Sequence, residues 1–122
     1  MCFSGHLLMR AHTAKEDIVC YKILDYNNGR YLAPFFPIEY KFNKVNKKET
    51  LKKEWGIFTW IINCGYHSFI DKNHAIDFYA SRIFGRIIME CVIPRGTKYY
   101  KNKNTYVSET IILKKIVYES NS

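Results

Sequence analysis

The sequence predicts an α+β domain in which one principal helix, at about residues 71–84, packs on a mainly antiparallel sheet. Three observations lead to this fold class. Several β-branched and aromatic runs are bounded by turn residues, one segment has apolar residues at helical spacing, and strand-like runs lie on both sides of it. The 122 residues fit a single domain spanning 1–122, and residues 1–14, which show no clean period, are expected to form a loose N-terminal arm.

The first third of the chain predicts a strand, a turn and a loop. Asp17–Leu24 is rich in β-branched and aromatic residues, which favour a strand, and Asn27–Gly29 is a turn sequence. Residues 31–40 contain Pro34 and Pro37, which exclude a helix and a central strand. We therefore expect an extended aromatic loop there.

The middle of the chain contains the predicted helix. Residues 41–54 predict either a short helix over Lys48–Lys53 or a solvated loop, and residues 55–63 are typical of a buried strand. In the next segment Asp71 is a suitable N-cap and Gly85 a suitable C-terminal stop. The apolar residues between them recur on one helical face: Ala75, Ile76, Tyr79, Ala80 and Ile83.

The last third predicts antiparallel strands joined by turns. Residues 94–96 and 101–104 are turn sequences, whereas 98–100 predicts a short strand and 106–118 one or two further strands. The segment Arg86–Ile93 alternates as a strand does. Its expected core face consists of Ile87, Met89, Cys91 and Ile93.

Positive charge is concentrated in two segments, within a formal net charge of +8. Residues 41–53 contain one acid, Glu49, and the lysines Lys41, Lys44, Lys47, Lys48, Lys52 and Lys53. Residues 95–115 contain one acid, Glu109, and the bases Arg95, Lys98, Lys101, Lys103, Lys114 and Lys115. Such segments indicate an acidic partner, which is nucleic acid, a nucleotide or an acidic protein surface. The alternative is that they keep a tyrosine-rich domain in solution.

Aromatic residues are interleaved with the second basic segment. The candidate contact residues are Arg95, Lys98, Tyr99, Tyr100, Lys101, Lys103 and Tyr106. Tyrosine faces stack on bases while lysines neutralise phosphates, which suits single-stranded or structured RNA, although tyrosine is also a common strand residue. A second aromatic group surrounds the two prolines and predicts either a protein-docking loop or a cap on the core. It consists of Tyr31, Phe35, Phe36 and Tyr40.

Motifs for catalysis and cofactor binding are not found in the sequence. The glycines are isolated, so there is no phosphate-binding loop, and no serine-hydrolase or zinc-protease motif occurs. Cys64 and His67 have zinc-ligand spacing, but the other local pair is Cys2 with His6 in the expected arm, so we expect no metal and no cofactor. Without a leader or an apolar run of about 18 residues, we expect a cytoplasmic protein with reduced thiols and no membrane span.

Several segments together resemble small phage-related proteins of Bacteroides-type bacteria. They are CYKIL at 20–24, GYHSF at 65–69, the helix with Ala75 and Tyr79, MECVIPRGTKYY at 89–100 and YVSETIIL at 106–113. The resemblance covers most of residues 17–117. Phage proteins of this size are often inhibitors of host defence, including anti-CRISPR proteins, so the resemblance implies such a role in the cytoplasm of a host bacterium.

The order of elements is also similar to the ADP-ribosyltransferase fold. Tyr21-Lys22, His67-Ser68 and Ser108-Glu109 correspond to that family's early basic strand, its serine-rich strand and its late glutamate. Lys22 replaces an arginine or histidine, the Ser-Thr-Ser run is absent, and Val107 stands where a second acid is expected. This resemblance implies an NAD- or nucleotide-using enzyme with a degenerate site at Tyr21, His67, Ser108 and Glu109.

The residues therefore predict a non-enzymatic binding protein, and the resemblance to phage-related proteins implies that it is a phage-derived inhibitor of a nucleic-acid-dependent host defence system. Its expected partner is a host defence protein or nucleoprotein complex, in which RNA or DNA is contacted through the two basic segments. The alternatives are the transferase-like enzyme and an interaction domain that docks through Tyr31–Tyr40.

Overall fold

The computed structural model of the chain describes residues 3–5, 11–32, 39–47, 53–55, 60–62, 66–79 and 86–119. In these ranges the regular structure consists of one helix, α1 (Lys72–Tyr79), and a series of short and long strands. The strands are β1 (Phe3–Gly5), β2 (His12–Thr13), β3 (Ile18–Asn27), β4 (Arg30–Leu32), β5 (Glu39–Tyr40), β6 (Val45–Lys47), β7 (Lys53–Trp55), β8 (Trp60–Ile62), β9 (Tyr66–Phe69), β10 (Arg86–Ile93), β11 (Lys98–Lys101), β12 (Thr105–Ser108) and β13 (Thr110–Glu119).

The predicted α+β class is wrong, because the structure is mostly antiparallel β-sheet and the fold is all-β. The helix predicted at about 71–84 begins as expected, since the amide of Asn73 donates to Asp71 Oδ1 at 2.9 Å in an N-cap contact. It is described over Lys72–Tyr79, and residues 80–84 lie outside the described residues. Eight residues make about two helical turns, which is too short to form a layer beside the sheet.

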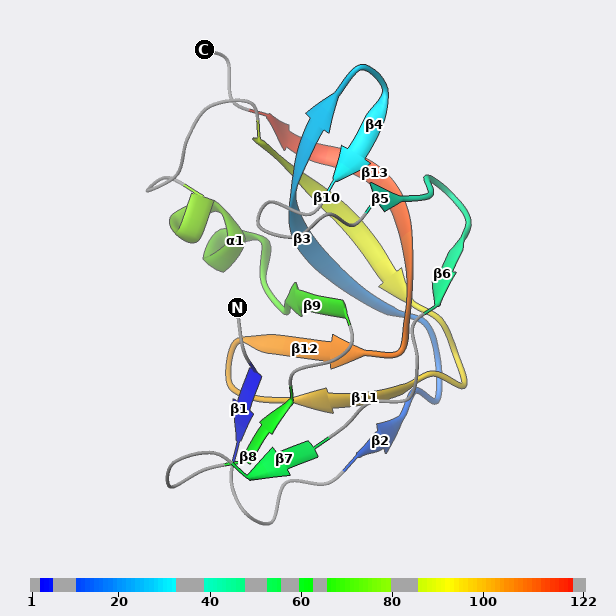
Figure 1. Cartoon of the computed structure of the whole chain (residues 1–122), viewed down its shortest axis with the longest axis vertical. Coiled ribbons are helices and arrows are strands. Elements are labelled where there is room, and N and C mark those ends of the chain that lie inside the picture. Colours follow the sequence, from blue (N-terminus) through cyan, green and yellow to red (C-terminus); the bar gives the residue numbers. More distant parts are fainter. Residues whose placement is uncertain are drawn as a thin grey trace.

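The strands form a ten-stranded sheet and a separate three-stranded sheet. The larger sheet has the order β2-β11-β12-β9-β3-β10-β13-β6, with β4 and β5 attached beside β3, and the smaller has the order β1-β8-β7. Figure 1 shows β11 and β12 running across the direction of β3, β10 and β13. The chain changes direction between β12 and β13, where Glu109 alone separates the two strands. The two halves of the larger sheet therefore fold over one another, with a core between them.

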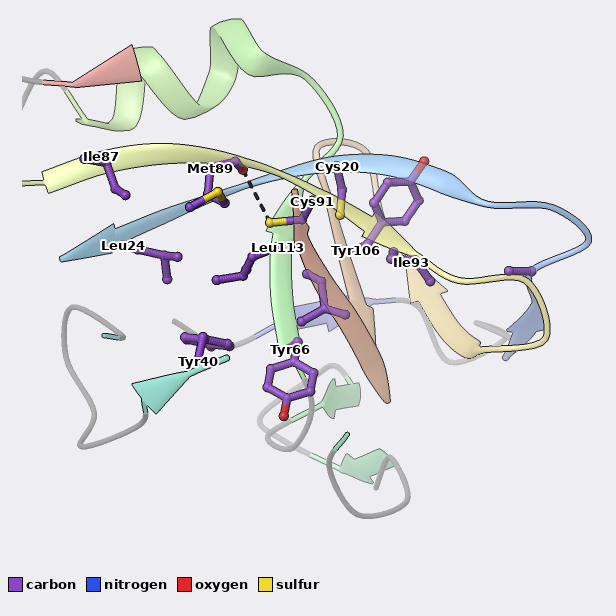
Figure 2. Close-up of a cluster of buried hydrophobic side chains, with 12 residues drawn as sticks. Cys20, Leu24, Tyr40, Tyr66, Ile87, Met89, Cys91, Ile93, Tyr106 and Leu113 are labelled. Atoms are coloured by element: carbon purple, nitrogen blue, oxygen red, sulfur yellow. Dashed lines mark hydrogen bonds between the residues drawn. The ribbon is translucent and has the colours of Figure 1, made fainter. Parts of the chain in front are cut away.

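Strand alternation places one face of β3 and β10 in this core. Cys20 and Leu24 of β3 point inward, and the predicted core face of β10 is confirmed, because all four of its residues are buried there. Figure 2 shows them gathered with Tyr66 of β9, Tyr106 of β12 and Leu113 of β13. Both halves of the sheet thus contribute to one cluster of side chains.

The opposite face of β3 and β10 is covered in part by α1. Ala75 of the helix packs with Ile23, Ile88 and Phe69 in a second, smaller apolar cluster. At the end of this face the cross-strand partners Asp25 and Arg86 form an ion pair, with 3.1 Å between Asp25 Oδ1 and Arg86 Nε. The helix therefore packs on one face of the sheet and does not form a layer of its own.

Several local predictions differ from the structure. The expected loose arm 1–14 contributes two strands, because β1 pairs with β8 and β2 with β11. The expected loop 31–40 has paired ends, with Tyr31 opposite Tyr40, and residues 33–38 lie outside the described residues. The expected strand at 55–63 is divided between the end of β7 and β8, and the stretch 106–118 is confirmed as two strands. The segment 41–54, expected as a short helix over Lys48–Lys53 or a solvated loop, contains the strand β6 and the start of β7, and residues 48–52 lie outside the described residues.

The turn predicted at Asn27–Gly29 is confirmed as a two-residue hairpin loop between β3 and β4. Asn27 pairs with Arg30, and both loop residues have positive φ, 52° at Asn28 and 78° at Gly29. These angles are those of a type I′ turn, which matches the right-handed twist of the strands.

We expect Gly29→Ala to lower the free energy of unfolding by about 1 kcal/mol, because a Cβ strains a left-handed residue. Urea denaturation measures this difference. Asn28→Gly is the matched control, and it should change the free energy by no more than a few tenths of a kcal/mol, because glycine adopts the same angle freely. Equal stability of wild type and Gly29→Ala would contradict the turn assignment.

The cross-strand partners Cys20 and Cys91 are fully buried free thiols. Burial raises the pKa of Cys20 to about 11, against smaller opposing effects of Ser68 and Lys22, and it raises the pKa of Cys91 well above its ordinary value. An unfolded chain releases these protons at lower pH than the folded one. The contribution of these thiols to the free energy of unfolding is therefore fully present below about pH 9 and is lost as the pH rises toward 11.

We expect the free energy of unfolding to fall by roughly 2–3 kcal/mol between about pH 9 and pH 11 on account of Cys20 alone. Urea denaturation across this range measures the fall. Cys20→Ala should start from a lower stability and lose less of it as the pH rises. A wild type and a variant with the same alkaline slope would show that the thiol does not titrate as a buried group.

Candidate functional site

The second basic segment lies along β11 and its two flanking turns. Arg95 stands in the turn before the strand, Lys101 ends the strand and Lys103 lies in the turn after it, and all three are exposed. Lys98, at the start of β11, is half-buried. None of these four cations forms an ion pair with another described residue. They are therefore available to a partner at both ends of a four-residue strand.

The tyrosines predicted to stack on bases are less open than the cations. Tyr100 is 7% exposed and Tyr106 is 8% exposed, and burial raises the pKa of Tyr106. Tyr99 is half-buried and stacks on exposed His12, with 5.4 Å between ring centroids, while its edge contacts Tyr106 at 5.7 Å. Among the described aromatic residues beside β11, the His12–Tyr99 stack is the one with a surface that solvent reaches.

The first basic segment begins in a short loop that is braced from inside. Asn46 is buried, and its Oδ1 accepts from the Lys41 amide at 2.9 Å. Its Nδ2 donates to the carbonyls of Lys41 at 3.0 Å, Lys44 at 3.2 Å and Ile111 at 3.3 Å. Lys41 and Lys44 are exposed on this loop and form no ion pair with a described residue. Lys47 lies in β6 and Lys53 in β7, whereas Lys48 and Lys52 lie outside the described residues.

The backbone brings the two basic segments to one corner of the molecule. Lys47 pairs with Thr110 at the start of β13. The preceding residue, Glu109, donates its amide to the carbonyl of Lys98 at 3.2 Å. Segments that are far apart in the sequence therefore meet where β12 turns into β13.

The sequence analysis named Tyr31 but missed Tyr26 and Phe42, whose rings both pack against Tyr31 at the start of the first basic segment. The Tyr26 and Tyr31 rings lie 5.1 Å apart between centroids, and Tyr31 stacks on Phe42 at 5.4 Å with an interplanar angle of 20°. Tyr26 is 46% exposed and Phe42 is 45% exposed. We call Tyr26, Tyr31 and Phe42 the aromatic row. The signal was present, because a two-residue turn at Asn28-Gly29 places Tyr26 opposite Tyr31. Phe35 and Phe36 lie outside the described residues.

The four residues of the transferase-like alternative do not share one face. Tyr21 of β3 packs with the cluster under α1, whereas Ser108 of β12 is fully buried and its hydroxyl donates to the Thr110 carbonyl at 3.0 Å. His67 pairs with Val107, so its side chain leaves the sheet on the opposite face from Ser108, and Glu109 lies in the corner after β12. The Ser108 hydroxyl is therefore engaged in a hydrogen bond within the fold, and Ser108 lies apart from Tyr21.

Metal sites and membrane helices were searched for in the described part of the chain. There, no three His, Cys, Asp or Glu side chains gather as metal ligands do, and Cys64 itself is outside it. No helix in those ranges is long and apolar enough to cross a membrane. No family model, curated protein sequence or solved structure matches this chain.

The difference in exposure between the two aromatic groups predicts different effects on stability. We expect Tyr106→Ala to lower the free energy of unfolding by about 2–4 kcal/mol, because it leaves a cavity in the core. We expect Phe42→Ala to lower it by less than about 1 kcal/mol. Urea denaturation of both variants checks this, and a larger loss from Phe42→Ala would show that its ring belongs to the core.

Proposed function

We propose that this chain is a non-enzymatic binding protein that takes nucleic acid, RNA or DNA, free or within a nucleoprotein, on its two basic segments. The observation that carries the proposal is the meeting of the two segments at the β12–β13 corner, where the backbone of Lys47 pairs with Thr110 and the amide of Glu109 donates to the carbonyl of Lys98. Exposed cations without carboxylate partners attract phosphates, and they lose few contacts of their own on binding.

The exposed cations fit a phosphate backbone better than an isolated anion. Arg95, Lys101 and Lys103 spread along β11 and its turns, and Lys41 and Lys44 add a second group on a braced loop. A linear polyanion contacts such a spread arrangement at several points, whereas a single small anion contacts one or two. The net charge of +8 adds a long-range attraction for the same partner.

The resemblance to small phage-related proteins supports a biological setting for this binding. We propose that the nucleic acid belongs to a defence complex in the cytoplasm of a host bacterium, and that the chain acts as an inhibitor of it. An inhibitor of this kind needs affinity for the complex and no catalytic residues of its own.

The direct test is fluorescence anisotropy with a labelled RNA and a labelled DNA oligonucleotide over a range of salt concentrations. Reversal of two cations, Lys101→Glu with Lys103→Glu, should weaken binding and lower the slope of log affinity against log salt by about 2, one for each lost phosphate contact. Neither side chain forms an ion pair with a described residue, and Lys101 loses only a contact at 6.0 Å from the centroid of the Tyr106 ring, so the melting temperature should change little.

The control reverses one charge outside both basic segments, Lys72→Glu in α1, whose side chain is exposed. It should keep most of the affinity and the slope. If the loss of affinity per reversed charge is the same in both variants, the net charge and not the β11 surface is responsible. If the wild-type protein binds neither oligonucleotide at low salt, the proposed function is wrong.

A further inference from the structure

From the aromatic row we infer that the nucleic acid taken by this protein is single-stranded, and that its unpaired bases stack on Tyr26 and Phe42. The inference rests on the proposed function and adds the class of nucleic acid and the place where its bases lie. Neither residue was suggested by the sequence, which pointed to Tyr99, Tyr100 and Tyr106, of which two are buried.

The exposed aromatic surface of the described residues is concentrated at the row. Five large apolar residues are exposed there and elsewhere: Val19, Tyr26, Phe42, Val45 and Tyr118. Phe42 lies in the braced loop, Val45 begins β6 directly after that loop, and Tyr26 reaches Phe42 through Tyr31. The Tyr26 ring is tilted by 52° to Tyr31 and Phe42 is stacked on Tyr31, so two partly exposed rings share one supporting ring.

The row is held in place from beneath. Tyr31 packs against the main core cluster and pairs with buried Tyr40 on β5. The type I′ turn fixes Tyr26 relative to Tyr31, and the Asn46 hydrogen bonds fix the loop that carries Phe42. Rings fixed in this way lose little conformational entropy when a base stacks on them.

The charged residues around the aromatic row favour an anionic ligand with aromatic groups, which is a nucleic acid. Lys41 and Lys44 flank Phe42 in the chain, are exposed and have no ion-pair partner among the described residues. Arg30 is already neutralised by Glu39, whose pKa it lowers, with 3.0 Å between Arg30 Nη2 and Glu39 Oε2. Aromatic platforms beside lysines suit single strands, whose bases have free faces and whose phosphates stay within reach. In a duplex those faces are already stacked.

The experiment compares a single-stranded oligonucleotide with a hairpin duplex of the same length at one salt concentration. The wild-type protein should bind the single strand more tightly. Tyr26→Ser with Phe42→Ser should lose at least about tenfold in affinity for the single strand, little for the duplex, and nothing in salt slope, because no charge changes. Lys41→Gln with Lys44→Gln should instead lower the salt slope.

Two further variants separate stacking from other effects. Tyr118→Ser removes an exposed tyrosine of β13 away from the row and should bind as the wild type does. Phe42→Trp should keep the affinity, and its added indole fluorescence should be quenched by the single strand and not by the duplex. Unchanged urea midpoints for all variants show that each is folded.

The outcomes distinguish the inference from the proposed function. No binding to either oligonucleotide overturns both. Equal binding of single strand and duplex, with the Tyr26 and Phe42 double variant unaffected, overturns the inference and leaves electrostatic binding by the basic segments in place. Binding of a protein partner that is lost only in the row variant, with nucleic-acid affinity unaltered, also overturns it.

Discussion

Eight residue pairs join β3 to β10, and every other strand of the larger sheet is attached to one of these two, directly or through its neighbours. On its other edge β3 reaches β9 through a single described pair, Tyr21 with Phe69. Lys22 strengthens this narrow seam, because its buried ammonium donates to the carbonyl of His67 and lies 5.2 Å from the centroid of the Tyr40 ring. The half of the sheet that carries β11 and its cations is held to β3 in this way.

The position of the aromatic row follows from the same pairing. Cys20, Lys22, Leu24 and Tyr26 alternate along one face of β3. The first three lie opposite Cys91, Met89 and Ile87, but β10 begins at Arg86, opposite Asp25. Tyr26 therefore lies just beyond the pairing with β10, on the face that is core elsewhere. At this end of the strand the Tyr26 ring is 46% exposed and packs against Tyr31 of β4.

Local pattern was sufficient for some parts of this molecule. The limits and core face of β10 and the turn at Asn28-Gly29 depend on alternation and on backbone preferences, which a short window contains. The fold class depends on the share of the chain that is helical or extended. The helical spacing at 71–84 indicates that a helix is present but not how small a part of the fold it forms. The burial of Tyr106 depends on the other half of the sheet folding over β12, and Tyr100 is buried on the opposite face of the sheet. No pattern within residues 95–106 reports that contact, so buried and exposed tyrosines look alike in the sequence.

The strand order also determines when the sheet can form during synthesis. β3 is complete near residue 27, but its long partner β10 starts at residue 86, and β2 waits for β11. Pairings so distant in sequence carry a large loop-closure cost and fold slowly. On the ribosome, the early strands would emerge with unpaired edges and an apolar face that has no cover. The nascent amino-terminal half is therefore open to pairing with other chains until β10 and β11 have been made.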